Sequence, residues 1–292
     1  MMKTVIIGAG EIGQALNYLL TKGARTKTFF WDKDPSKVPN QEPLEELMPK
    51  ADLVFLGIPS QAVNSALQGI KPLLSEKAAI ISLSKGIEED SLKTMDEVLE
   101  SGLSPETAYG LLSGPMIAEE ILNGKNAAAI LATSHKRLFT KVRKLLPEYF
   151  KLAYSRDKKG VALAGVLKNI FSVGLGIADG LELGANFKGW YVEEACSEMM
   201  MINSLLGGKK ETILGLAGIG DFIATGFSKN SKNFEAGFIC AKENKCRIES
   251  EGVRSLPSLM RKLGTSEFQI LNGLETIVSN NKKASEVFQG FI

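Results

Sequence analysis

The segment 3–32 constrains the fold of this chain more strongly than any other. An apolar run, residues 3–7, leads directly into the glycine-rich segment GAGEIG, and residues 11–23 then show the apolar spacing of a helix that ends at Gly23. A second β-rich run follows at residues 26–32. A strand, a glycine turn, a helix and a second strand form a βαβ unit, so the chain begins as a parallel α/β sheet.

The same alternation continues through the first half of the chain. Further short β-rich runs are separated by helical stretches, at residues 51–60, 78–86, 107–115 and 127–133. This pattern is typical of a doubly wound parallel sheet with helices on both faces. From about Ala153, long segments with helical periodicity replace the strands, at residues 160–183, 191–208 and 252–264. We predict an α/β domain over residues 1–153 and an all-helical domain over residues 154–292.

Gly8, Gly10 and Gly13 have the spacing of a dinucleotide-binding turn. Glycines at these positions allow a tight turn, close approach of the backbone to a pyrophosphate and close packing of helix on strand. Asp32 ends the second strand, where a carboxylate binds the hydroxyls of the adenosine ribose. A carboxylate there repels a 2′-phosphate, which favours NAD over NADP, although Lys33 offsets part of this repulsion. The first domain is therefore predicted to bind a dinucleotide.

Composition and charge exclude several classes of protein. Among 292 residues, 44% are hydrophobic and 23% are charged, as in an ordinary globular chain. The net charge of +2 provides no electrostatic footprint for nucleic acid or an anionic membrane. No apolar run has the length needed to span a bilayer, and no secretory signal pattern precedes the first strand. We expect a cytoplasmic protein without an integral membrane segment.

The cysteines and the histidine predict neither a disulfide framework nor a metal site. Cys196, Cys240 and Cys246 are an odd number of cysteines, and His135 is the single histidine. Their spacing matches no metal-ligand pattern. We expect Cys240 and Cys246 to be thiols, and we expect no bound metal.

Lys168 interrupts an apolar helical run. At helical spacing it shares one face with Val161, Ala164, Phe171 and Leu175, so its ammonium lies in a stripe that should be buried. A buried ammonium is costly without a partner, and the structural alternative is a lysine that snorkels or forms an ion pair in the core. This cost makes Lys168 a candidate functional residue.

Other polar residues follow strands or glycine-rich turns. Lys85 lies near the end of the run at 78–86 and Gly114 lies near the end of the run at 107–115, so both should lie at the carboxyl edge, where open α/β sheets bind ligands. Asp221 follows the glycine-rich segment GLAGIG, and SKNSKN, residues 228–233, supplies a cluster of lysines and amides. Each feature alone is more typical of a solvated loop.

Together these segments resemble the NAD(P)-dependent glycerol-3-phosphate dehydrogenases. The segments GAGxxG, SKGIE, SGPxxAEE, LKN, GIADGLELG, GLAGIGD, SKN and EGV follow one another over nearly the whole chain. The resemblance implies an N-terminal Rossmann domain, an all-helical substrate domain and usually a homodimer. It also implies an oxidoreductase that reversibly reduces dihydroxyacetone phosphate to sn-glycerol 3-phosphate with NAD(P)H and feeds glycerophospholipid synthesis.

The resemblance implies roles for residues at matching positions. Lys168 would be the catalytic lysine, with Lys85 and Asp221 beside it. The implied substrate contacts are Lys85, Gly114, Asn169, Thr225, Ser231, Lys232 and Asn233. The implied cofactor contacts are Gly8, Gly10, Glu11, Ile12, Gly13, Asp32, Lys85, Ala118, Lys232 and Glu251.

The chain departs from the family pattern at several positions. Ile12 stands where an aromatic residue often covers the cofactor, Met116 replaces a small polar residue, and the segment between Asp34 and Ala51 is shorter. Lys232 replaces an arginine. The planar guanidinium of arginine can form two parallel hydrogen bonds with a phosphate, and a lysine cannot reproduce this bidentate contact. Two alternatives stay open: a related two-domain dehydrogenase with a different small keto or phosphorylated substrate, and a catalytically silent dinucleotide-binding protein.

Overall fold

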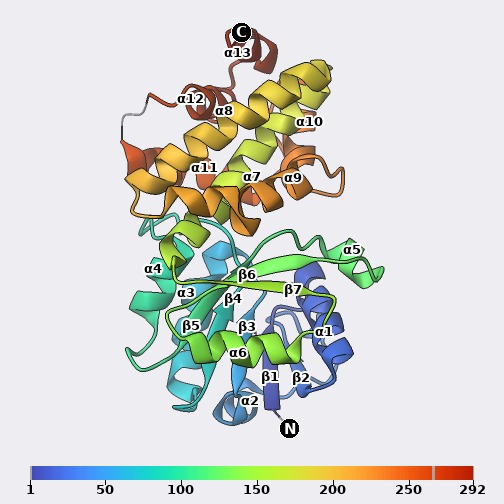
Figure 1. Cartoon of the computed structure of the whole chain (residues 1–292), viewed down its shortest axis with the longest axis vertical. Helices are drawn as coiled ribbons and strands as arrows, with labels where there is room; N and C mark the ends of the chain where they lie inside the picture. Colours follow the sequence, from blue (N-terminus) through green and yellow to red (C-terminus); the bar gives the residue numbers. More distant parts are fainter. Residues whose placement is uncertain (1, 265–266, 292) are drawn as a thin grey trace. The chain divides into compact units, whose positions relative to one another are not determined.

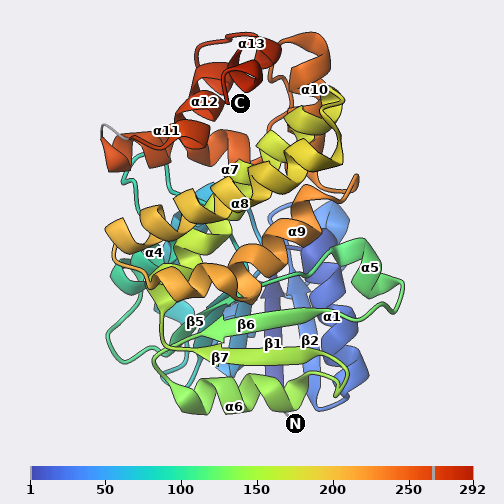
Figure 2. The same cartoon turned by 45° about the horizontal axis from the view of Figure 1, so that its top comes forward.

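The computed structural model describes residues 2–264 and 267–291 (Figures 1 and 2). The chain divides into two compact units. The first comprises Met1–Lys85 and Met95–Lys158, and the second comprises Gly86–Thr94 and Lys159–Ile292.

The first unit is built on a seven-stranded sheet with the strand order β2-β1-β3-β4-β5-β6-β7. The strands are β1 (Met2–Ile7), β2 (Thr26–Trp31), β3 (Leu53–Leu56), β4 (Ala79–Ser82), β5 (Tyr109–Ser113), β6 (Ala128–Ala132) and β7 (Lys151–Ser155). Strands β1 to β5 pair in parallel, β6 is antiparallel to β5, and β7 is parallel to β6. The predicted doubly wound sheet is confirmed, with one antiparallel junction that the alternation did not predict.

Helices cover both faces of this sheet. They are α1 (Glu11–Gly23), α2 (Leu44–Leu47), α3 (Val63–Ile70), α4 (Met95–Gly102), α5 (Ala118–Leu122) and α6 (Lys136–Leu145). Leucines of α1 and α6 share one core cluster with Ile6, Phe55 and Ile81 of the sheet. The neighbouring residues Val5 and Val54, which point to the opposite face, are also fully buried. Burial on both faces explains why these strands are continuously apolar.

Strand β7 carries the first unit past residue 153, where we expected its boundary. Residues 151–155 pair with β6 along their whole length, and the long helix α7 begins only at Lys158. The segment Gly86–Thr94, which follows β4, belongs to the second unit. Its ends are joined by an antiparallel bridge between Ile87 and Thr94.

The second unit is helical throughout its named elements. They include α7 (Lys158–Gly180), α8 (Gly184–Leu205), α9 (Asp221–Gly226), α10 (Lys232–Glu243), α11 (Glu251–Leu263), α12 (Gln269–Val278) and α13 (Ala284–Gln289). The helices predicted at 160–183, 191–208 and 252–264 are confirmed as α7, α8 and α11. Helix α10 crosses α7 closely, since a Cβ added at Gly237 would lie 1.9 Å from the carbonyl oxygen of Val173.

Helix α7 corrects the expectation that no segment is long and apolar enough to cross a membrane. By length and composition α7 meets both criteria, but its most apolar stretch is buried within the protein. It is the central helix of the second unit, buried at every position from Gly160 to Ala178. A core helix needs apolar residues on all its faces, which is why it meets the same criteria.

The cysteines give a second correction. Cys240 and Cys246 form a disulfide instead of remaining thiols, and Cys196 is a free, buried cysteine. Asn244 adopts a left-handed conformation at the C-terminus of α10 and turns the chain back. This turn brings the two cysteine Cα atoms to 4.4 Å, a proximity that six-residue spacing does not reveal.

Helix α12 begins against a buried carboxylate. The two carboxylate oxygens of Glu198, on α8, accept hydrogen bonds from the N–H groups of Ile270 at 2.7 Å and Leu271 at 3.0 Å. Phe268, at the N-cap position, provides no side-chain cap. Glu198 therefore performs the capping role from another helix, and its negative charge complements the positive end of the helix dipole.

We expect Glu198 to make stability depend on pH. Burial raises the pKa of its carboxyl above the usual 4.5, and the nearby Glu194 adds to this rise, although the backbone N–H groups oppose it. The folded state therefore binds this proton more tightly than the unfolded chain. The contribution of this group to stability is largest below pH 4.5 and declines as the pH rises through the folded-state pKa. Urea unfolding at a series of pH values measures this effect. As the pH rises, the free energy of unfolding should fall less steeply for Glu198→Gln than for the unmodified protein. An unchanged slope would contradict this assignment.

Candidate functional site

The glycine turn after β1 is tied to the end of β2. Gly8 has a φ of +102°, and a Cβ added at Gly13 would lie 2.0 Å from the carbonyl oxygen of Gly8. The Asp32 carboxylate accepts hydrogen bonds from the N–H of Ala9 at 2.8 Å and the N–H of Asp34 at 2.9 Å. A carboxylate has about four lone pairs, so acceptor capacity remains for ribose hydroxyls. These contacts hold the glycine turn and the end of β2 together.

Gln41 supports Asp32, and our sequence reasoning missed it. Its side-chain amide forms two hydrogen bonds of 2.9 Å with the backbone N–H and carbonyl of Asp32. Gln41 lies in the shortened segment between Asp34 and Ala51, which carries no motif. No sequence pattern predicts that one side-chain amide will form hydrogen bonds with both the N–H and the carbonyl of a distant residue.

The other predicted cofactor residues of the first unit lie at helix starts. Gly10 is the N-cap of α1, Glu11 is its exposed first residue, and Ala118 begins α5. Ile12 and Met116 line the same small cavity, of about 10 Å³. These two residues, which both depart from the family pattern, therefore lie close together. The flexible side chain of Met116 occupies volume beside Ile12, which is smaller than the aromatic residue often found at its position.

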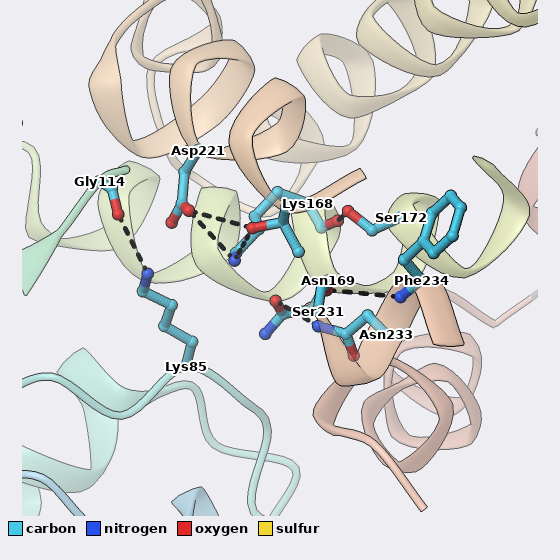
Figure 3. A network of polar contacts seen from close by, with 10 residues as sticks. Lys85, Gly114, Lys168, Asn169, Ser172, Asp221, Ser231, Asn233 and Phe234 are labelled. Atoms are coloured by element: carbon cyan, nitrogen blue, oxygen red, sulfur yellow. Dashed lines mark hydrogen bonds and ion pairs between the residues drawn. The ribbon is translucent and has the colours of Figure 1, made fainter. Parts of the chain in front are cut away.

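Lys85 and Gly114 come together at the carboxyl edge of the sheet, as predicted from their strands. The Lys85 ammonium lies 3.5 Å from the carbonyl oxygen of Gly114 (Figure 3). Gly114 has a φ of +137°, a conformation that glycine adopts without strain. The preceding Ser84 donates a hydrogen bond of 2.6 Å to the carbonyl of Ile58. These contacts hold the loop that presents Lys85.

In the second unit, Lys168 is buried against Asp221 and Thr225 (Figure 3). Its Nζ lies 3.2 Å from Asp221 Oδ1 and donates to the Thr225 hydroxyl at 2.7 Å. The Thr225 hydroxyl in turn donates to Asp221 Oδ1 at 3.2 Å. The side chains of Lys168 and Asp221 are 7% and 4% exposed. This burial strengthens their attraction and fixes the position of the ammonium.

The chain places Asp221 and Thr225 through an irregular turn. Residues Leu216–Gly220 form a π-helical segment that is kinked at Gly218, and α9 begins at Asp221. Asp221 and Thr225 are four residues apart, so they lie on one face of α9. Interruptions of this kind often occur at functional sites because they redirect a side chain.

Asn169 and Asn233 form a second polar cluster. Asn233 Nδ2 donates a hydrogen bond of 2.9 Å to Asn169 Oδ1 (Figure 3). The Oδ1 atom of Asn233 accepts a hydrogen bond of 2.9 Å from the N–H of Gly252. Both amides are buried. Because its oxygen is engaged in this way, Asn169 directs N–H groups away from Asn233.

The remaining predicted residues lie at the first turns of α10 and α11. Ser231 is the N-cap of α10, and its hydroxyl accepts a hydrogen bond from the N–H of Phe234 at 3.4 Å. Lys232 and Glu251 are the first residues of α10 and α11, and Lys232 is exposed. Across residues 2–264 and 267–291, no group of three or more acidic, histidine or cysteine side chains could hold a metal ion.

A Rossmann-type unit combined with a helical unit that buries a lysine–aspartate pair defines a two-domain dinucleotide-dependent dehydrogenase. Residues 32–139 match the family model of the NAD-dependent glycerol-3-phosphate dehydrogenase N-terminus, and residues 157–289 match that of its C-terminus. The chain belongs to this family. The family membership that its motifs indicated is confirmed.

The sequences of relatives are similar to this chain along nearly its whole length. Glycerol-3-phosphate dehydrogenase [NAD(P)+] from Ectopseudomonas mendocina is 32% identical, over 97% of this chain and 85% of the relative. The enzyme of the same name from Fusobacterium nucleatum is 30% identical, over 98% of this chain and 95% of the relative. The crystal structure of glycerol-3-phosphate dehydrogenase from Coxiella burnetii has the same fold, with a TM-score of 0.90 at 24% identity, over 99% of this chain and 98% of that one.

Proposed function

We propose that the chain catalyses reversible hydride transfer between NAD(P)H and dihydroxyacetone phosphate, which gives sn-glycerol 3-phosphate. The observation that carries this proposal is the buried cluster of Lys168, Asp221 and Thr225 in a chain of this family. A buried ammonium with fixed partners is suited to donate a proton at a defined atom.

The first unit would bind the dinucleotide at the turn of Gly8, Gly10 and Gly13. A Cβ at Gly13 would collide with the carbonyl oxygen of Gly8, so this glycine lets α1 pack closely on the turn, and the N–H groups that start α1 suit a pyrophosphate. Asp32 would accept hydrogen bonds from the adenosine ribose. When bound, the nicotinamide supplies the hydride.

Lys168 would be the proton donor in the direction of reduction. Negative charge develops on the carbonyl oxygen of the substrate as its carbon is reduced, and the ammonium donates a proton to that oxygen. Asp221 and Thr225 hold the ammonium in place through contacts of 3.2 and 2.7 Å. Positioned acid catalysis typically contributes about 10²- to 10⁴-fold to a rate.

The substrate phosphate would bind at the start of α10. A helix N-terminus presents N–H groups to an anion, and Lys232 adds a positive charge at the first position. Asn169 would donate hydrogen bonds to the substrate, because Asn233 occupies its oxygen. Lys85 and Gly114 would contact substrate or cofactor at the sheet edge.

The proposal extends to assembly and context. Met201, Leu205 and Leu214 are exposed apolar side chains beside a groove of about 790 Å³ on the second unit. Such a surface supports a homodimer, and sedimentation velocity would show a single dimeric species. We further propose that the enzyme works in the cytoplasm and feeds glycerophospholipid synthesis, since sn-glycerol 3-phosphate is the backbone of those lipids.

The test of the proposal is oxidation of NADH with and without dihydroxyacetone phosphate. Oxidation that depends on this substrate, with stoichiometric sn-glycerol 3-phosphate as product, supports it. The departures at Met116 and Lys232 favour one rival, a dehydrogenase of another small keto compound. Turnover of a keto acid but not of dihydroxyacetone phosphate would support that rival. NADH binding without any turnover would support a silent binding protein.

Cofactor preference gives a prediction about Asp32. Because its carboxylate should repel a 2′-phosphate, kcat/KM is expected to be higher with NADH than with NADPH. Asp32→Asn removes the charge but keeps one acceptor for the N–H of Ala9, so it should narrow the difference between the cofactors. Steady-state kinetics with both cofactors measure this difference. Equal preference in the unmodified enzyme would overturn the role assigned to Asp32.

A further inference from the structure

Four cationic side chains surround one pocket on the first unit. The pocket has a volume of about 420 Å³ and is lined by Arg25, Arg137, Lys141 and Lys144, together with Met2, Thr140 and Leu145. Arg137, Thr140, Lys141 and Lys144 recur at the spacing that places them on one face of α6. Arg25 reaches the same pocket from the turn before β2, and it donates a hydrogen bond of 3.3 Å to the carbonyl of Lys144. None of these lining residues is acidic.

The arrangement of charge on α6 is unfavourable in the absence of a counterion. Its sequence, KRLFTKVRKL, contains five cationic residues and no acidic one. Arg137 and Lys141 are four residues apart, and Lys141 and Lys144 are three apart, so neighbouring like charges repel on the lining face. The whole chain has a net charge of only +2, so this concentration of charge is local. An anion in the pocket would relieve the repulsion.

Lys141 is the most enclosed of the four cations. It is partly buried, and its Nζ donates a hydrogen bond of 2.9 Å to the carbonyl oxygen of Asp52. Burial lowers the pKa of its ammonium below the usual 10.5, and the nearby Asp52 carboxylate opposes this shift only in part. That carboxylate also accepts a hydrogen bond of 2.8 Å from the N–H of Lys3. An added anion would therefore stabilise the charged form of Lys141.

The pocket lies at the opposite end of the sheet from the dinucleotide turn. Met2 begins β1 and Arg25 directly precedes β2, whereas the turn from Gly8 to Gly13 follows the carboxyl end of β1. Figures 1 and 2 both show α6 beside the start of β1. A six-residue strand spans about 20 Å, so one small ligand cannot occupy both places.

The occupant suggested by the pocket is a small soluble anion. A volume of about 420 Å³ lies within the range of small-molecule sites. Leu138, Val142 and Leu145, the apolar face of α6, are buried in the core, so the helix has no free apolar face to insert into a lipid layer. Several cations around one concavity suit a phosphate group, which carries two charges.

We propose that this pocket is a second anion site, separate from the catalytic site, that binds a soluble phosphate ester. Arg137 and Lys144 contact the phosphate from α6, Arg25 contacts it from the turn before β2, and the partly buried Lys141 is the most enclosed of the lining cations.

The test is a labelling experiment that reports on individual lysines. The full-length protein is acetylated with acetic anhydride at constant ionic strength while inorganic phosphate is varied, and the extent of modification is measured by peptide mass spectrometry. We expect saturable protection of Lys141 and Lys144. Lys136 lies on the same helix but outside the pocket, and it should remain unprotected. Absence of protection, or equal protection of Lys136, would overturn the proposal.

Matched variants separate this pocket from other anion sites. Arg137→Ala should weaken the phosphate-dependent protection of Lys141 by about tenfold or more, because it removes one charge-assisted contact. Lys136→Ala removes the same charge from the same helix, and Lys232→Ala removes the lysine proposed for the substrate phosphate, so both should leave this protection intact. Equal weakening in Arg137→Ala and Lys136→Ala would mean that only overall charge matters, which would refute the site.

A vesicle experiment distinguishes a soluble ligand from a lipid headgroup. Sedimentation with phosphatidylglycerol vesicles should carry down no more protein than sedimentation with phosphatidylcholine vesicles. Binding to the anionic vesicles that is lost in Arg137→Ala would replace the soluble ligand with a membrane surface and overturn the proposal.

Discussion

Lys168→Met is expected to lower kcat by about 10²- to 10⁴-fold while NADH still binds, because the variant removes the proposed proton donor and leaves the glycine turn untouched. Steady-state kinetics and NADH fluorescence titration measure the two effects separately. A variant that retains more than about a tenth of the activity would exclude a role for Lys168 as a general acid.

Loss of stability has to be separated from loss of chemistry in this variant. Lys168→Met leaves the Asp221 carboxylate buried without its ammonium, and breaking a buried ion pair costs about 3–5 kcal/mol. The double variant Lys168→Met, Asp221→Asn has no charge at either position and keeps an amide for the Thr225 hydroxyl. We expect it to recover much of the thermal stability but none of the activity. Recovery of both would show that Lys168 is only structural.

Lys188 provides a matched control in the same unit. It forms an ion pair of 2.8 Å with Asp179, and the two side chains are 23% and 30% exposed. Lys188→Met makes the same chemical change in a partly solvated pair, where the energetic cost is small. Its kcat should stay within about twofold of that of the unmodified enzyme.

The second large effect concerns the phosphate of the substrate. Removing it deletes the contacts proposed at the start of α10, and two charge-assisted hydrogen bonds contribute about 1.5–3 kcal/mol each. We therefore expect kcat/KM for dihydroxyacetone to be about 10³-fold lower than for dihydroxyacetone phosphate. Binding energy from the distant phosphate is used in the transition state, so kcat should fall as well as affinity. Comparable kcat/KM values for the two substrates would refute a phosphate site.

The variant Lys232→Ala tests whether Lys232 binds the phosphate of the substrate. It should raise KM for dihydroxyacetone phosphate by about tenfold and leave KM for NADH nearly unchanged, because a lysine supplies one point charge and no fork. Inorganic phosphate should inhibit the unmodified enzyme competitively with this substrate. Lys229→Ala makes the same change of charge in the same SKNSKN segment and should alter neither constant. Equal effects of the two variants would assign the interaction to general electrostatics instead of to Lys232.

Local patterns were sufficient for much of the fold. The spacing of Gly8, Gly10 and Gly13 between a strand and a helix depends on backbone approach over a few residues, and α1 has the predicted bounds of Glu11–Gly23. Lys168 could be singled out because a charge within an apolar helical stripe is unusual. Asp221 could be assigned a role only through the resemblance to the family, because a charged residue after a glycine turn is by itself typical of a solvated loop. The roles assigned to them stay predictions until the variants are measured.

Long-range pairing was not available from such patterns. The antiparallel direction of β6, the presence of β7 and the placement of Gly86–Thr94 in the second unit depend on which segments meet after folding. The Cys240–Cys246 disulfide depends on the left-handed turn at Asn244.

The sequence by itself determined the family, the dinucleotide turn and the buried lysine, because each rests on residues that are neighbours along the chain. Only the tertiary structure decided which groups those residues contact. It placed the amide of Asn233 between Asn169 and Gly252, and it brought Arg25 to the cationic face of α6. Hydrogen bonds and charge repulsion act over a few ångströms in space, and residues far apart in the chain reach such distances only once the strands and helices have packed.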